Sequence, residues 1–180
     1  TAQNGLGLMY HKGKGVPQDY KTAVKWYRLA AEQGFARAQY NLGVMYATGR
    51  GVSQNDKTAV KWWKLAAEQG YANAQTNLGV MYDNGRGVSQ NDKTAVKWYR
   101  LAAEQGYATA QNGLGVMYAY GSGVLKDYIR AHMWGNLAAM NGNKLGAKLR
   151  DEFEKKMTPA DISTAQKLAR ECIRKKYKGC

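Results

Sequence analysis

Apolar residues within 36–47 recur at spacings of three and four, which is the pattern of a helix with one buried face. Ala38, Leu42 and Met45 fall on that face, and Gly49 follows the last apolar position. A glycine just beyond the periodic residues is a common signal of a helix end. The pattern therefore predicts one helix that ends in a tight turn.

A second amphipathic helix is predicted after this turn, over residues 56–69. Asn55 precedes it, where a side-chain oxygen can accept hydrogen bonds from the first backbone N–H groups of a helix. Trp62 and Trp63 lie on its apolar face, and Gly70 supplies the left-handed residue that a helix C-terminus prefers. The two helices form one helix-turn-helix unit.

This unit, residues 38–73, is repeated along the chain. Residues 74–109 repeat it with six changes, and residues 2–37 and 110–145 are looser copies in the same register. Because one such unit cannot bury its apolar face alone, the copies must stack. We therefore predict an all-α protein, an α/α superhelical solenoid of 36-residue helix-turn-helix repeats. The six changes are Tyr40/Thr76, Ala47/Asp83, Thr48/Asn84, Trp63/Tyr99, Lys64/Arg100 and Asn73/Thr109.

Gly43 lies in the middle of the first helix of this unit, where glycine costs about 1 kcal/mol relative to alanine. It returns in every copy. We interpret it as a point of close helix approach, with Trp62 as the expected neighbour. Ten helices in five antiparallel pairs are predicted, over residues 2–12, 20–33, 36–47, 56–69, 72–83, 92–105, 108–119, 127–141, 143–155 and 159–176.

The fourth copy differs because its second helix is apolar where the first copy carries charges. Ile129, Met133 and Met140 occupy these positions, so another segment must cover them. Residues 158–161, Thr-Pro-Ala-Asp, are a typical helix start. We predict that residues 146–180 form a helical cap for the exposed end of the solenoid. The apolar stripe of this cap consists of Ile162, Ala165, Ala169, Cys172 and Ile173.

The chain is strongly basic, with 27 Lys and Arg against 13 Asp and Glu and a formal net charge of +14. The cations recur on the polar face of each second helix, which favours a solvated outer face. An acidic protein partner or a membrane surface is the alternative. Nucleic acid is disfavoured because no recognition motif accompanies the charge. The recurring cations are Lys21, Lys25, Arg28, Lys57, Lys61, Lys64, Lys93, Lys97 and Arg100.

No catalytic or metal-binding motif is apparent. The turn glycines, as in Gly49-x-Gly51, follow helices rather than strands and lack the Lys-Ser/Thr ending of a phosphate loop. His11 and His132 lie three copies apart with no Cys, Asp or Glu grouped around them at ligand spacing, so neither a metal nor a cofactor is predicted. No serine begins an S-x-x-K motif. The serines are Ser53, Ser89, Ser122 and Ser163.

These repeats resemble the Sel1-like repeat family. The shared pattern is A-x-x-x-L-G-x-x-Y-x-x-G-x-G-V followed by A-x-x-W-x-x-x-A-A-x-x-G, and the resemblance covers residues 2–145. It implies a solenoid related to tetratricopeptide repeats that holds other proteins. The matching residues of the second copy are Ala38, Leu42, Gly43, Tyr46, Gly49, Gly51, Val52, Ala59, Trp62, Ala66, Ala67 and Gly70.

The resemblance also implies a disulfide bond between Cys172 and Cys180, because cysteine-rich members close the hairpin between successive helices at this separation. In the repeat register these residues match Ala31 and Gln39. An unbroken helix would hold their Cα atoms about 12 Å apart, so the helix must end before Gly179. A bonded pair predicts a periplasmic or secreted protein. Two free thiols in a reducing compartment are the alternative.

Several functions are consistent with the resemblance. The first is a non-catalytic protein-binding solenoid, either an adaptor or an immunity protein that neutralises a toxic secreted effector. The alternative is a secreted β-lactamase-like or penicillin-binding enzyme, as suggested for cysteine-rich members of the family. Residues 1–7 duplicate 109–115, so we expect a mature product or a segment of a longer array.

Comparison of the copies predicts where a partner binds. Packing positions of the first helices hardly change, whereas positions on one neighbouring side vary freely. In the family the first helices line the concave surface, so these side chains should face a groove that holds a protein or peptide. Neutral drift on an exposed face is the alternative. The predicted contact residues are Asn4, His11, Lys12, Tyr40, Asn41, Thr48, Thr76, Asn77, Asp83, Asn84, Asn112 and Tyr120.

Overall fold

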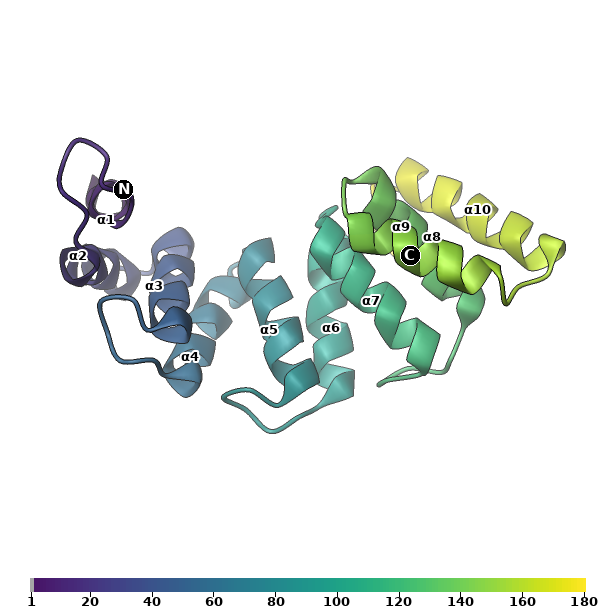
Figure 1. Ribbon diagram of the computed structural model, residues 1–180, viewed down its shortest axis with the longest axis horizontal. Helices are drawn as coiled ribbons and strands as arrows, with labels where there is room; N and C mark the ends of the chain where they lie inside the picture. Colours follow the sequence, from purple (N-terminus) through teal and green to yellow (C-terminus); the bar gives the residue numbers. More distant parts are fainter. Residues whose placement is uncertain (1) are drawn as a thin grey trace.

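The computed structural model describes residues 2–180, and over these residues it contains ten α-helices and no strand. The helices stack into an elongated array with α1 at one end and α9 and α10 at the other (Figure 1). This is the all-α solenoid that the repeats predict. The helices are α1 Ala2–Lys12, α2 Tyr20–Glu32, α3 Ala36–Thr48, α4 Asp56–Glu68, α5 Ala72–Asn84, α6 Asp92–Ala103, α7 Ala108–Tyr120, α8 Tyr128–Met140, α9 Lys144–Glu154 and α10 Pro159–Arg174.

Consecutive helices from α1 to α9 pack against one another. In addition, α5 packs against α7 and α7 packs against α9. These three are the first helices of their pairs. Helices on the inside of a curved stack lie closer together than those on the outside, so this packing places the first helices on the inner side of that part of the array.

The helix ends agree closely with those predicted, the largest differences being at α6 and α10, which end two residues before 105 and 176. The predicted caps are confirmed. Asn55 Oδ1 accepts a hydrogen bond from the backbone N–H of Thr58 at 2.9 Å. Thr158 and Asp161 form a reciprocal capping box at the start of α10. A side-chain cap therefore marks the start of α2, α4, α6, α8, α9 and α10, whereas α3, α5 and α7 begin without one.

A glycine at the centre of each of the helices α1, α3 and α5 makes room for an aromatic ring. A Cβ atom on Gly43 would lie 2.5 Å from the ring of Trp63, closer than any real contact. The prediction that Trp62 is this neighbour is wrong. Trp62 is half-buried and packs against the core cluster that α2 and α3 form together. The equivalent pairs are Gly7 with Tyr27 and Gly79 with Tyr99.

The fourth copy replaces the aromatic ring with Gly135, and α9 occupies the space. A Cβ on Gly115 would lie 2.7 Å from Leu149 Cδ2 of α9. A Cβ on Gly135 would lie 3.0 Å from the carbonyl oxygen of Gly146. The backbones of α8 and α9 therefore approach one another more closely than side chains would allow.

The helix α10 packs against α8, the second helix of the fourth copy. Met133 is buried there, as the apolar face of α8 predicts, and Ile129 is half-buried. Met140 is 63% exposed, so the prediction that α10 covers it is wrong. Met140 is the last residue of α8.

Candidate functional site

The predicted contact residues fall into three sets with different environments. The first set lies at the junctions between copies. Asn4 and Thr76 are buried, and Asn41 donates a hydrogen bond from Nδ2 to Asn4 Oδ1 at 3.1 Å. Thr76 Oγ1 donates to the carbonyl oxygen of Ala72 at 2.9 Å. The bond between Asn41 and Asn4 joins two neighbouring first helices, whereas the bond of Thr76 lies within α5. Asn112 belongs to the same set and is half-buried.

Tyr40 is the largest side chain of this first set. Its ring lies against that of Tyr71, with centroids 5.2 Å apart, and its carbonyl oxygen accepts a hydrogen bond from Trp63 Nε1 at 3.1 Å. Burial and the neighbouring Tyr71 raise the pKa of Tyr40, while a hydrogen bond from Asn77 opposes them. Tyr40 is therefore half-buried and contributes to the junction between copies two and three.

The second set pairs with the aromatic residue of the second helix within each copy. His11 Nδ1 lies 3.5 Å from the Tyr27 hydroxyl, and the Tyr99 hydroxyl hydrogen-bonds Asp83. Burial lowers the pKa of His11 and raises that of Asp83. The second copy has alanine at this position and a tryptophan, which has no hydroxyl. The residue at this position therefore varies with the aromatic residue that it faces in the second helix of the same copy.

The third set, which we call the variable row, consists of Lys12, Thr48, Asn84 and Tyr120. All four are exposed, and each lies at the C-terminal end of a first helix. Thr48 and Asn84 each hydrogen-bond a backbone carbonyl of their own helix at 2.8 Å. Tyr120 is 65% exposed. Of the predicted contact residues, these four are the most accessible.

An open cleft of about 210 Å³ lies beside the variable row, between copies two and three. We call it the Ala47 cleft, because Ala47 occupies the position of His11 and Asp83 and leaves the space open. Comparison of the copies showed only that the position of Ala47 varies. The small size of alanine was the signal in the sequence that could have indicated a cleft. The lining residues are Ala47, Thr48, Trp63, Asn77, Val80, Met81 and Arg86.

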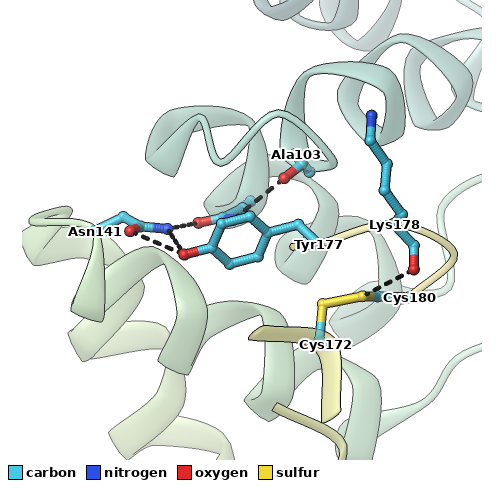
Figure 2. The surroundings of a disulfide bond; sticks show 7 residues. Ala103, Asn141, Cys172, Tyr177, Lys178 and Cys180 are labelled. Carbon is cyan, nitrogen blue, oxygen red and sulfur yellow. Dashed lines mark hydrogen bonds between the residues drawn. A yellow bond between two sulfur atoms is a disulfide. The ribbon is translucent and has the colours of Figure 1, made fainter. Parts of the chain in front are cut away.

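Cys172 and Cys180 form a disulfide bond with their Cα atoms 5.6 Å apart, the pairing predicted (Figure 2). The two cysteines are eight residues apart, the same separation as Ala31 and Gln39, which form a hydrogen bond between the successive helices α2 and α3. Gln39 Nε2 donates to the carbonyl oxygen of Ala31 at 3.2 Å, and Gln75 and Gln111 repeat the contact. The disulfide therefore ties the tail back to the end of α10.

The tail beyond α10 turns back through two left-handed residues, Lys176 and Tyr177. Figure 2 shows the Tyr177 ring beside Asn141, and their side chains hydrogen-bond at 3.3 Å. Asn141 also donates to Gln111 Oε1 at 2.9 Å. The tail is thus linked to the end of α8 and to the start of α7.

His132 is a buried polar residue that sequence reasoning did not place. Its Nε2 atom lies 3.6 Å from Glu154 Oε2, beyond hydrogen-bond length. Burial lowers the pKa of His132, and Glu154 opposes this effect. Glu154 is 22 residues away in sequence, so no local pattern signals the contact. Among the described residues, no group of three or more His, Cys, Asp or Glu is arranged to hold a metal ion.

Stacked antiparallel helix pairs with one recurring junction define an α/α solenoid repeat protein. The Sel1 repeat model matches residues 1–35, 36–71, 72–107 and 108–143, so this chain belongs to the Sel1 repeat family. Sel1 repeat proteins bind other proteins. None of the helices within residues 2–180 is long and apolar enough to cross a membrane.

Solved structures with the same fold include two bacterial relatives. A protective antigen of uropathogenic Escherichia coli that displays an SLR fold is 38% identical, with a TM-score of 0.89 over 97% of this chain. A Sel1 repeat protein from Oxalobacter formigenes is 42% identical, with a TM-score of 0.79 over 84%. This chain covers 38% and 62% of their lengths.

A Pseudomonas aeruginosa protein, PA5086, shares the fold at 22% identity and a TM-score of 0.56, over 93% of this chain and 68% of its own. No curated protein matches the sequence.

Proposed function

We propose that this chain is a non-catalytic protein-binding scaffold whose partner contacts the variable row and the adjoining Ala47 cleft. The observation that carries the proposal is the contrast within each first helix. The packing positions repeat almost unchanged, whereas the row Lys12, Thr48, Asn84 and Tyr120 presents four different exposed side chains. A rigid scaffold with a chemically varied row is suited to recognise one extended polypeptide.

The cleft gives this surface a place for an anchor. Its lining includes Trp63, Asn77 and Arg86. The Arg86 guanidinium pairs with Asp56 at 3.2 Å, so the cleft wall is held in place. We propose that an apolar side chain of the partner fills the cleft while the variable row contacts its backbone. An adaptor and an immunity protein would both use such a surface.

We further propose that the protein works in the periplasm or outside the cell. The disulfide between Cys172 and Cys180 supports this location, because such bonds persist in oxidising compartments. Thiol titration of protein isolated from its native compartment should find no free cysteine. Two reactive thiols would contradict the location.

The binding surface is tested by substitution after affinity capture from the cell envelope and mass spectrometry have supplied the partner. Asn84→Ala with Tyr120→Ala should weaken binding about tenfold or more without altering the circular dichroism spectrum. Tyr40→Ala with Asn77→Ala should also weaken partner binding, because it loosens the junction between copies two and three. The thermal midpoint of this variant is therefore measured as well. Lys61→Ala with Lys97→Ala on the outer face is the matched control and should leave this partner's affinity nearly unchanged. A larger loss of affinity in the Lys61 and Lys97 variant than in the Asn84 and Tyr120 variant would contradict the proposed surface.

The proposal includes the absence of catalysis. The β-lactamase-like alternative is tested by nitrocefin turnover, which we expect at the level of buffer. Turnover that follows the protein through purification would contradict the non-catalytic scaffold.

A further inference from the structure

Exposed leucines recur on the outer side of the array. Leu29, Leu65 and Leu101 occupy the same position in the second helices α2, α4 and α6, and their residues are 45%, 45% and 38% exposed. We call these three residues the leucine row. A single exposed leucine is ordinary, but the same one in three successive copies forms a periodic surface.

Each of two leucines of this row lies in an open cleft with cations around it. The cleft on α4 has a volume of about 270 Å³, and the one on α6 has about 370 Å³. Among the described residues, no lysine lining these clefts forms an ion pair. The linings are Thr58, Lys61, Trp62 and Leu65 in the first, and Lys93, Val96, Lys97, Arg100, Leu101, Glu104 and Val124 in the second.

The fourth copy shows what this face can hold. Leu137 occupies the position of the leucine row but is fully buried, and Met133, at the position of Lys97, is buried as well. The helix that packs against this face of α8 is α10. Leu168 and Cys172 of α10 line one small cleft together with Met133. The array therefore already contains one amphipathic helix seated on the face that α2, α4 and α6 leave open.

We infer that the leucine row is a second docking surface, which binds an amphipathic helix of another protein with an apolar stripe and acidic flanks. The apolar stripe would cover the leucines much as α10 packs on the face of α8 that carries Met133. Acidic flanks would meet the unpaired lysines, including Lys61 and Lys97, whose charge the fourth copy lacks. The surface lies on the second helices and is separate from the variable row.

A second copy of this chain is a poor occupant on grounds of charge. Each chain has a formal net charge of +14, so two copies repel one another. The apolar stripe of α10 is already used within its own chain, and its exposed side carries further cations. These cations are Lys167, Arg170 and Arg174.

The test uses two fluorescent peptides built on residues 158–174. Both carry Cys172→Ser, and the acidic probe also carries Lys167→Glu, Arg170→Glu and Arg174→Glu. Fluorescence anisotropy at low salt should show saturable binding of the acidic probe by the full chain. The probe that keeps the native cations should bind at least about tenfold more weakly, and added salt should narrow this difference.

The protein variants separate apolar docking from simple charge attraction. Leu29→Ala, Leu65→Ala and Leu101→Ala combined should weaken binding of the acidic probe at least about tenfold. Because all three leucines are exposed, the fold should survive, which circular dichroism checks. Tyr120→Ala should leave the probe unaffected, so failure here is distinguishable from failure of the proposed function.

Three outcomes would overturn the inference. In the first, the acidic probe does not bind. In the second, it binds the triple leucine variant as tightly as the unaltered chain, so that non-specific charge attraction alone explains the binding. Alternatively, vesicles rich in phosphatidylglycerol could bind in a leucine-dependent manner while the probe does not. That last result would assign the leucine row to a lipid surface.

Discussion

At the residue scale, the most restrictive contacts are those between a first-helix glycine and a second-helix aromatic ring. They explain part of the variation between copies without any partner. Tyr99 carries a hydroxyl and faces Asp83, whereas Trp63 instead donates to the Tyr40 carbonyl and faces Ala47. Two of the six differences between copies two and three are therefore linked by packing.

Gly43→Ala should destabilise the fold by about 1–3 kcal/mol, the usual cost of overpacking. The added Cβ would meet the Trp63 ring at 2.5 Å. Gly5→Ala is the matched control, because Gly5 also lies within a first helix but has no atom within 4 Å of its would-be Cβ. That variant should gain about 0.5–1 kcal/mol from helix propensity. Urea unfolding measures both, and equal effects of the two substitutions would contradict the close-approach role.

Acidification should loosen the end of the array through His132. Burial lowers its folded-state pKa below 6.5, so the unfolded chain takes up a proton that the folded chain resists. Stability is then present above pH 6.5 and lost as the pH falls below it. The charged groups facing the ring are Glu154, Arg150 and Asp151.

The measurement is the thermal midpoint at about pH 7.5 and about pH 5.5. His132→Gln should reduce the decrease in thermal midpoint between these two pH values. His11→Gln is the comparison, because His11 is the other histidine with a lowered pKa. If Glu154 dominated instead, the unaltered chain would become more stable on acidification and the sign of the effect would reverse.

At the element scale, caps and turns define each helix, but the last one depends on a covalent closure. The helix α10 ends at Arg174. The disulfide then ties the tail back to α10, and Tyr177 hydrogen-bonds Asn141 at the end of α8. Residues 175–180 contain two left-handed residues other than glycine, a conformation that needs such support.

Replacing both cysteines by serine should free this tail. The loss is expected to be about 2–3 kcal/mol from the entropy of a short closed loop. Hydrogen exchange should show lost protection at residues 172–180, with protection of α1 to α5 unchanged because the effect is local. Unchanged protection of the tail would contradict a supporting role for the disulfide.

At the scale of the whole molecule, the solenoid is a one-dimensional stack. Contacts run between neighbouring helices and neighbouring copies, and the division into copies 2–37, 38–73, 74–109 and 110–145 with a cap of 146–180 is the one we propose. Copies two and three differ at only six positions, so their junctions are nearly interchangeable. Stability should then be close to a sum over copies and their interfaces.

Deleting residues 74–109 should therefore leave a shorter folded array. Its helical signal per residue should match that of the full chain, and its thermal midpoint should be lower because one interface is lost. Deleting residues 74–91 is the control, because it removes one helix and places two second helices in succession. Circular dichroism and size-exclusion chromatography compare the two deletion variants. If both variants folded equally well, the repeat-by-repeat assembly would be contradicted.

The sequence by itself determined the helices, their caps, the turns and the repeat, because each depends on residues a few positions apart. The disulfide partner followed from the repeat register and the family resemblance. Only the tertiary structure decided that Trp63, not Trp62, fills the space beside Gly43, and that Asn4, which bonds Asn41 of the next copy, and Thr76 are buried. It also decided that Met140 is exposed while Leu137 is buried. These facts depend on how closely and at what angle helices cross, which is set by contacts between residues distant in sequence.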